Sequence, residues 1–204
     1  MKNILLIAII LFNLGFSGKK HMNIEVVPKE KQDEVLIKGP VEKGGYGGLV
    51  IKFTELNDDF ACLIGGRGGI ILNHTFSVGG GIYGLANRID VHTNYPLRDY
   101  IMDFSYGGLI LELIFGSRRL VHFGISSLIG GGCISYRTPF YEPWYDDGFF
   151  VFEPSAEITL NVTKCFRIDI GSSYRYIYGT DLNGVSDNSL SGAAGHITFK
   201  FGKF

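Results

Sequence analysis

The stretch LIGGRGGIILNHTFSVGGGIYGL, residues 63–85, places eight glycines and one arginine among Ile, Leu, Val and Phe. Glycine has no side chain to pack and loses the most backbone freedom on folding, so an isolated strand of this composition is poorly ordered. Closure of a sheet into a barrel supplies that order, because every strand is then held by two neighbours. A narrow barrel also needs small residues wherever a large side chain, such as Arg67 or Tyr83, lies across its lumen. The stretch therefore favours two strands of a small closed barrel.

After residue 44 the chain alternates between apolar and polar positions, with turn residues between the alternating segments and no sustained helical period. The eight predicted strands span residues 45–56, 60–72, 76–91, 100–115, 120–137, 149–161, 165–180 and 189–203. Every second residue of a strand points to the same side of a sheet, so most of these segments have one apolar face and one polar or charged face.

The joins between the predicted strands vary in length in a regular way. The short joins lie at 57–59, 73–75, 116–119 and 162–164, and the long joins at 92–99, 138–148 and 180–189. Past the first join, short and long alternate, as they do in outer-membrane barrels, which have short periplasmic turns and longer external loops. If residue 44 leaves the periplasm, all three long loops lie outside the cell and both termini lie inside.

The alternation alone does not say which face is inside. A soluble sandwich or a lipocalin turns its apolar face inward, and the pattern permits that arrangement too. Three features favour a membrane barrel: aromatic residues crowd the strand ends and loop edges, the chain ends in the aromatic Phe204, and the strand count is even with both termini on one side. We therefore predict an all-β fold over residues 44–204, an eight-stranded antiparallel up-and-down transmembrane β-barrel. Phe204 is out of step with Phe199 and Phe201, so the last two residues are expected to bulge or fray.

The N-terminus predicts export. Residues 1–17 combine Lys2, an apolar run over 4–16 and small residues near the end, which is the pattern of a signal peptide cleaved after Ser17. An uncleaved anchor is the alternative, although this run is shorter than the roughly 20 residues of a transmembrane helix. Residues 18–43 are rich in charged residues and are expected to form a polar leader or one short strand ahead of the barrel. The predicted location is the bacterial outer membrane.

Composition argues against several classes of function. The chain has 204 residues, a formal charge of -1 and 19% charged residues, so no nucleic-acid partner is expected. Cys62, Cys133 and Cys165 form no CxxC motif and have no zinc-site spacing with histidine. Buried or membrane-facing thiols are expected, and a disulfide between two of the three is the alternative. Neither a metal nor a cofactor is predicted.

Catalytic motifs are weak. GGGIYG at 79–84 matches GxGxxG, but no helix follows it, so a dinucleotide site is not expected. The chain has no GxSxG, no phosphate-binding loop and no HExxH. Barrel enzymes of the lipid A deacylase kind carry a His and a Ser two residues apart on one strand, whereas here His196 is followed by Thr198. We expect a structural or lumen-lining histidine and a protein that is not an enzyme.

The polar face of the predicted strands carries both signs of charge. The predicted inward-facing charges are Lys52, Arg67, Glu112, Glu157, Arg167, Asp169, Arg175 and Lys200. Charges in a closed lumen are costly unless paired, so a salt-bridged plug is expected, with an ion path as the alternative. Arg67 is predicted to lie within reach of Glu112 or Glu157.

One long join is rich in aromatic residues. TPFYEPWYDDG, residues 138–148, contains Tyr141, Tyr145 and the only tryptophan of the chain, Trp144. Aromatic side chains give a large contact area for few rotatable bonds, and proline limits the entropy lost on binding. An aromatic rim at the outer lipid interface is one interpretation, and a recognition loop for a surface partner or a glycan is the other.

Segments spread over residues 44–204 resemble a known family. They are GGYGGLVIKFTELND, IGGRGGIILNHTFSVGGGIYGL, YGGLILELIF, LVHFGISSLIGGG, EPSAEITLNVTKCFRI and LSGAAGHITFKFGKF. Together they resemble a family of exported bacterial outer-membrane β-barrel proteins, and the architecture more distantly resembles the small OmpX-type and OmpA-type barrels. The resemblance implies a fold and a location, and it brings no activity or catalytic residue.

These observations lead to one functional hypothesis and two alternatives. The hypothesis is a monomeric, non-enzymatic outer-membrane protein that serves envelope integrity or surface contact through its external loops. Its partners would be outer-membrane lipid and a surface ligand. A narrow pore or transport protein is the first alternative, and a barrel enzyme that acts on envelope lipids is the second.

Overall fold

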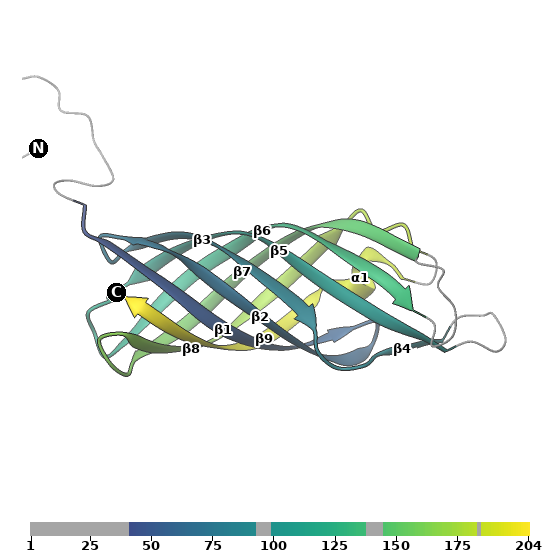
Figure 1. The fold of residues 1–204 in the computed structure, drawn as a ribbon, viewed down its shortest axis with the longest axis horizontal. Helices are drawn as coiled ribbons and strands as arrows, with labels where there is room; N and C mark the ends of the chain where they lie inside the picture. The colour runs from purple at the N-terminus through teal and green to yellow at the C-terminus, as the bar shows by residue number, and fades with distance from the viewer. Residues whose placement is uncertain (1–40, 93–98, 138–144, 183–184) are drawn as a thin grey trace, which may run out of the picture. The chain divides into compact units, whose positions relative to one another are not determined.

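The computed structural model describes residues 41–92, 99–137, 145–182 and 185–204, which form a β-barrel with one short helix (Figure 1). The strands are β1 (Lys43–Leu56), β2 (Asp59–Leu72), β3 (Phe76–Leu85), β4 (Asp90–His92), β5 (Asp99–Phe115), β6 (Val121–Arg137), β7 (Tyr145–Asn161), β8 (Phe166–Tyr178) and β9 (Gly192–Lys203). The helix α1 spans Asp187–Leu190. Among the described residues, no helix is long and apolar enough to cross a membrane.

All strand pairings are antiparallel, and the sheet closes on itself. Apart from the short β4, each strand pairs with the next along the chain, and β1 pairs with β9 from Gly45 opposite Lys203 to Thr54 opposite Ala194. β4 pairs only with the outer part of β5, whose remaining length pairs with β3, so β3 and β4 together occupy one place in the barrel. The predicted eight-stranded antiparallel up-and-down barrel is confirmed.

The strand predicted over 76–91 is wrong in its second half. β3 ends at Leu85, and the chain leaves the sheet before β4 begins at Asp90. The side chain of Asn87 explains the break, because its Oδ1 accepts from the Cys62 N–H at 2.7 Å and its Nδ2 donates to the Phe60 carbonyl at 2.8 Å. The side chain thus takes the place of a backbone partner for β2 and lets the chain turn away.

Two other predicted boundaries also move. The last strand begins at Gly192 rather than at residue 189, because Ser186 and Ser189 form a reciprocal capping box that starts α1. The join predicted over 138–148 is shorter at its end, because β7 already begins at Tyr145, opposite Tyr136 of β6. These local hydrogen bonds and pairings do not alter the strand count.

The two ends of the barrel differ. At the end that we call the terminal end, β1 begins beside the end of β9, and the turns at 73–75, 116–120 and 162–165 connect strands. At the opposite loop end lie the turn at 57–58, helix α1 and the strand ends that flank residues 93–98 and 138–144 (Figure 1). The tight turns use left-handed backbone, with φ of 53° and 66° at Asn57 and Asp58, which matches the twist of a two-residue hairpin.

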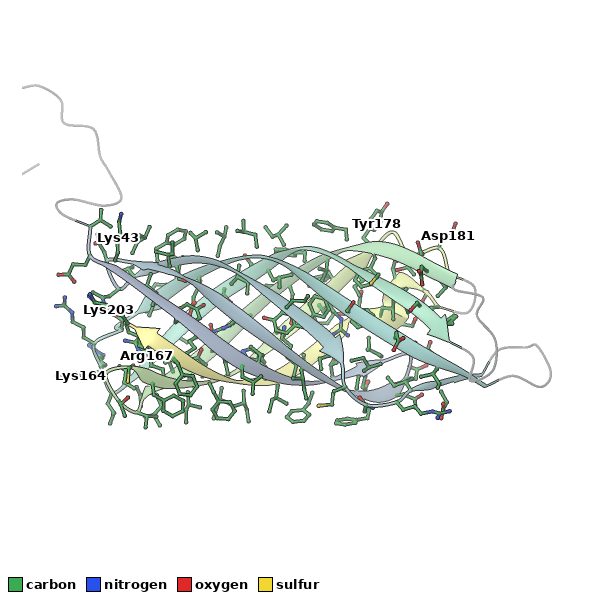
Figure 2. The ribbon with its side chains drawn as sticks, in the orientation of Figure 1. Lys43, Lys164, Arg167, Tyr178, Asp181 and Lys203 are labelled. Carbon is green, nitrogen blue, oxygen red and sulfur yellow. The ribbon has the colours of Figure 1, made fainter. Side chains whose placement is uncertain are left out.

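The outer surface of the barrel is apolar, as the side chains in Figure 2 show. The large hydrophobic side chains exposed on the strands include Leu49, Ile64, Ile70, Ile82, Leu109, Phe123, Ile129, Phe152, Ile158, Ile170 and Phe201. A soluble monomer rarely exposes so large a continuous apolar area. The side chains that alternate with them point into the lumen and include most of the buried charges. This arrangement suits a barrel surrounded by hydrocarbon.

A closed barrel of this kind predicts a gel shift. In detergent, the folded protein is expected to migrate differently when it is not boiled, because all backbone hydrogen bonds of the sheet are internal and a closed sheet has no edge at which unfolding starts. Electrophoresis of boiled and unboiled samples measures the shift. Identical migration, together with a helical circular dichroism spectrum, would contradict the fold.

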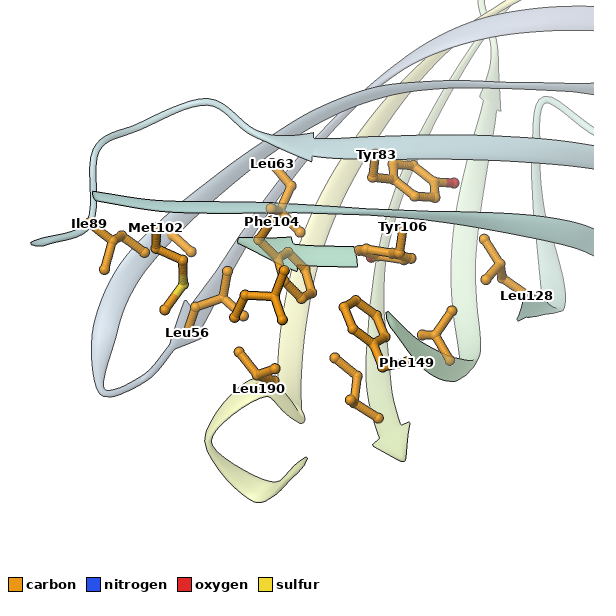
Figure 3. Packing of buried hydrophobic residues seen from close by; sticks show 14 of the residues in the cluster. Leu56, Leu63, Tyr83, Ile89, Met102, Phe104, Tyr106, Leu128, Phe149 and Leu190 are labelled. Atoms are coloured by element: carbon orange, nitrogen blue, oxygen red, sulfur yellow. The ribbon is translucent and has the colours of Figure 1, made fainter. Parts of the chain in front are cut away.

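The loop end of the lumen is filled by apolar side chains (Figure 3). Phe104 stacks on Phe149 with ring centroids 5.2 Å apart, and Leu190 of α1 is a fully buried member of the same cluster. Buried Leu56 and Leu63 complete it on the side of β1 and β2. The packing closes this end of the barrel to water.

The terminal end has a smaller apolar cluster made by Tyr46, Ile71, Ile114 and Phe204. The expected fraying of the last two residues is wrong. Lys203 pairs with Gly45 in the sheet, and the Phe204 ring stacks on Tyr46 at 6.3 Å. The Phe204 ring is held in place because it packs inside the mouth of the barrel, where it also contacts the Arg167 guanidinium.

Candidate functional site

A layer of charged side chains lies in the lumen between the two apolar clusters. All eight residues predicted from the sequence are buried in the structure: Lys52, Arg67, Glu112, Glu157, Arg167, Asp169, Arg175 and Lys200. They come from six strands, because alternate residues of each strand point inward. Most of them converge in one ion-pair network, and the others form separate contacts.

The central network joins two cations to three carboxylates. Arg67 lies 2.7 Å from Glu157 and 2.8 Å from Asp169. Lys200 lies 2.7 Å from the same Asp169 and 2.8 Å from Glu112. Of the two carboxylates expected beside Arg67, Glu157 therefore contacts it, and Glu112 binds Lys200 instead. Because none of these groups has access to bulk water, each charge depends on its partners.

A second buried pair involves a residue that the sequence reasoning missed. The Lys52 ammonium lies 2.8 Å from Glu153 and 3.7 Å above the ring of Tyr83. Tyr106 and Ser173 donate hydrogen bonds to the same carboxylate. Glu153 has the parity of Glu157 in β7, so the alternation contained the signal.

Arg175 and Arg167 stand apart from the network. Arg175 is fully buried, donates from Nε to the Leu190 carbonyl at 2.9 Å and donates to the Glu55 carbonyl at 3.3 Å. It thereby ties α1 to the end of β1. Arg167 lies near the terminal end, with its guanidinium carbon 4.0 Å from the centroid of the Phe204 ring.

Glycine makes room for these side chains at close approaches. A Cβ on Gly171 would lie 2.9 Å from both the Glu157 Cβ and the His196 ring. A Cβ on Gly81 would lie 3.0 Å from the Tyr83 hydroxyl and 3.3 Å from the Arg67 Cβ. Part of the glycine content thus follows from the width of the lumen, because a bulky inward residue requires a small neighbour.

His196 lies inside the lumen, where the sequence suggested it. Its Nε2 is 3.6 Å from Glu157, and both His196 and Thr198 are buried. Glu157 is occupied by Arg67 at 2.7 Å, so the carboxylate is held by a cation rather than left to orient the imidazole. This geometry fits a lumen-lining histidine rather than a nucleophile and base.

The space left among these charges is small. A cavity of about 20 Å³ lies beside Lys52, Arg67, Glu153 and His196, and one of about 10 Å³ lies beside Lys200 near the terminal end. A water molecule needs roughly 10–15 Å³ measured this way, so each cavity holds about one water. These dimensions leave room for single water molecules among the paired charges.

The loop end presents acidic and polar groups outside the lumen. Its acids include Glu55, Asp58, Asp59, Asp90, Asp99, Asp146, Asp147, Asp181 and Asp187. A groove of about 590 Å³ there is lined by Phe53 and Phe60 and by polar residues of α1 and of the β1–β2 turn. The backbone N–H groups of Thr180 and Gly179 donate to Asp187 and hold the pKa of its carboxyl below the usual value.

The predicted aromatic contact residues are only partly described. Tyr141 and Trp144 lie outside the described residues, and Tyr145 opens β7 at the loop end. Cys62, Cys133 and Cys165 are free thiols in the structure. Among the described residues, no group of three His, Cys, Asp or Glu side chains is arranged to hold a metal ion.

Comparisons with known proteins give a clear answer for the fold. Neisserial surface protein A (NspA) is similar in structure, with 11% identity, a TM-score of 0.53, and 81% of this chain and 100% of that chain covered. This chain has the fold of a small eight-stranded outer-membrane barrel.

Two further outer-membrane barrels align over a similar length. The N-terminal β-barrel domain of Pseudomonas aeruginosa OprF has 11% identity and a TM-score of 0.48, covering 77% of this chain and 96% of that one. Ail of Yersinia pestis, solved with a heparin analogue, has 13% identity and a TM-score of 0.47, covering 79% and 97%. No family model matches the sequence, and the search of curated proteins finds no match.

Proposed function

We propose that the protein is a non-enzymatic β-barrel of the bacterial outer membrane that serves envelope integrity or surface contact through its external loops. The observation that carries the proposal is the inverted distribution of side chains, with an apolar exterior and a lumen filled by paired charges and packed rings. A filled lumen cannot admit a ligand, so a water-soluble ligand would have to be recognised at one of the two ends of the barrel. The loops are the natural place for recognition, because loops in general tolerate changes of length and sequence that leave the scaffold intact.

The proposed orientation places the terminal end in the periplasm and the loop end outside the cell. The signal-peptide pattern of residues 1–17 supports export. The length of the joins supports the orientation, because the terminal end has only short turns, whereas three of the four connections at the loop end are longer, the exception being the turn at 57–58. In this orientation the acidic groups of the loop end and the groove beside α1 face the outside of the cell.

The two alternatives are less well supported by the geometry. A pore requires a continuous aqueous path, whereas the lumen is packed with side chains and has cavities of about 20 and 10 Å³. An enzyme requires an accessible nucleophile and base, whereas His196 and Thr198 are buried. Conductance in planar bilayers tests the first alternative, and lipid mass spectra of cells with and without the protein test the second.

Replacement of residues 138–144 is expected to leave the barrel folded, because the change stops before β7 begins at Tyr145. A wider deletion reaching Asp147 would remove strand pairs and the hydrogen bond from the Asp181 N–H, and is expected to disturb the loop end. A protease site placed at 138–144 should be cut on intact cells. The matched control is the same site in the turn at 162–164, which should be protected. The reverse result would refute the orientation.

Bacterial strains that lack the protein or carry a loop variant distinguish a role in envelope integrity from a role in surface contact. Cells that lack the protein would be tested for sensitivity to detergent and for adhesion to surfaces. If the barrel itself supports the envelope, the variant with residues 138–144 replaced restores detergent resistance. If the loops make a surface contact, the same variant fails to restore adhesion. Wild-type behaviour of the deletion strain in both assays would argue against either role.

A further inference from the structure

The terminal end of the barrel carries a basic rim. Its bases are Lys43, Arg118, Arg119, Lys164 and Lys203, and Glu42 is the only acid among the described residues of this end. Lys43, Lys164 and Lys203 are labelled together at that end in Figure 2. Because the loop end is acidic, the barrel has opposite charge at its two ends, and the ligands that suit the two ends differ accordingly.

A groove runs from this rim along the outer surface of the barrel. It has a volume of about 590 Å³, and its apolar lining is formed by Phe115, Val121, Phe123 and Ile158. The rings of Phe115 and Phe123 stack at 5.9 Å and are about half exposed. Arg119 closes the groove at the turn between β5 and β6. The groove therefore offers a cation at the rim and an aromatic and aliphatic surface behind it.

The backbone of the turn that carries Arg119 is fixed by hydrogen bonds, but the Arg119 guanidinium forms no ion pair with the described residues. Asn161 donates to the carbonyls of Ser117 and Arg119 at 3.0 and 2.6 Å, and the Arg119 N–H donates to Gly116 at 2.8 Å. Among the described residues, no carboxylate lies within 4.0 Å of the Arg119 guanidinium. The neighbouring Arg118 makes one loose contact, 3.9 Å from Glu42.

We propose that this groove binds an anionic phospholipid, with Arg119 on the phosphate and the acyl chain along Phe115, Phe123 and Ile158. The guanidinium matches a phosphate because its planar fork can donate two parallel hydrogen bonds. The excess of bases on the rim favours a lipid with net negative charge over a zwitterionic one. The inference rests on the proposed membrane location, since it requires the groove to lie at the inner leaflet.

Native mass spectrometry of the purified barrel tests the proposal. The protein would be exposed to equal amounts of phosphatidylglycerol and phosphatidylcholine, and the ratio of the two bound lipids would be measured. Wild type is expected to bind phosphatidylglycerol preferentially, and Arg119→Gln should lower that preference about fivefold. Arg119→Lys keeps the charge and should retain most of it. The matched control is Arg88→Gln, an exposed arginine at the opposite end, which should leave the ratio unchanged.

Each outcome of the experiment has one meaning. Equal binding of the two lipids by wild type, or an unchanged ratio in Arg119→Gln, overturns the proposed lipid site. The gel shift of every variant is measured in parallel and shows whether the barrel is folded. If Arg119→Gln does not fold, the lipid ratio of Arg119→Lys is compared with that of wild type instead. A wild-type barrel that fails to insert into lipid vesicles refutes the proposed function itself. A barrel that inserts but shows no preference refutes only this inference.

Discussion

Replacing Arg67 by Met is expected to lower the free energy of unfolding by about 3–5 kcal/mol, the usual cost of removing one partner from a buried ion pair. Arg67 is the nearest cation to Glu157 at 2.7 Å and shares Asp169 with Lys200. Without it, three buried carboxylates of the network depend mainly on Lys200. The variant should also show a weaker gel shift in detergent, because the barrel unfolds more readily.

The double variant Arg67→Met with Glu157→Met measures the interaction energy between the two side chains. It should cost less than the sum of the two single variants, since removing both charges leaves no new unpaired group at this contact. Urea unfolding of the barrel reconstituted in lipid measures each free energy. Arg88→Met is the control, because Arg88 pairs with Asp90 on the exposed surface and should cost about 1 kcal/mol or less. Strict additivity of the two lumen substitutions would contradict a coupled pair.

The second large effect is expected on the outer surface. Ile170→Arg should destabilise the barrel in a bilayer by about 2–4 kcal/mol, the cost of an arginine near the middle of the lipid-facing surface. Ile170 lies in the central part of β8 and is 61% exposed. In a soluble protein the same exchange at so exposed a site would change stability by roughly 0.5 kcal/mol or less. The sign and size of the effect therefore report what surrounds the barrel.

A control on the same strand gives the depth dependence. Tyr178 is 76% exposed at the outer end of β8, where an arginine can reach the interface (Figure 2). Tyr178→Arg should cost about 0–1 kcal/mol. Both variants would be unfolded by urea in the same lipid vesicles, with the single tryptophan as the fluorescent probe. Equal effects at the two positions would argue against a membrane-spanning β8.

Much of the architecture could be predicted from local features of the chain. Alternation over two residues defines a strand and its two faces, and Asn57 and Asn73 each introduce a tight hairpin turn. The exceptions are instructive. Asn87 ends β3 because its side chain replaces a backbone partner of β2, and Ser186 caps a helix over 187–190 whose last two residues were predicted to begin the final strand. Both depend on side-chain hydrogen bonds that a hydrophobic pattern does not contain.

The contacts within the lumen required the tertiary structure. The sequence determined that Arg67 and Glu157 face the same side of the sheet, because parity is a local property of each strand. It did not determine that they meet, since they lie 90 positions apart in the chain and are brought together by the register and closure of the barrel. The same closure assigned Glu112 to Lys200 and Glu153 to Lys52, and it placed Phe204 against Tyr46. Pattern decides which way a side chain points, and only the closed sheet decides what it touches.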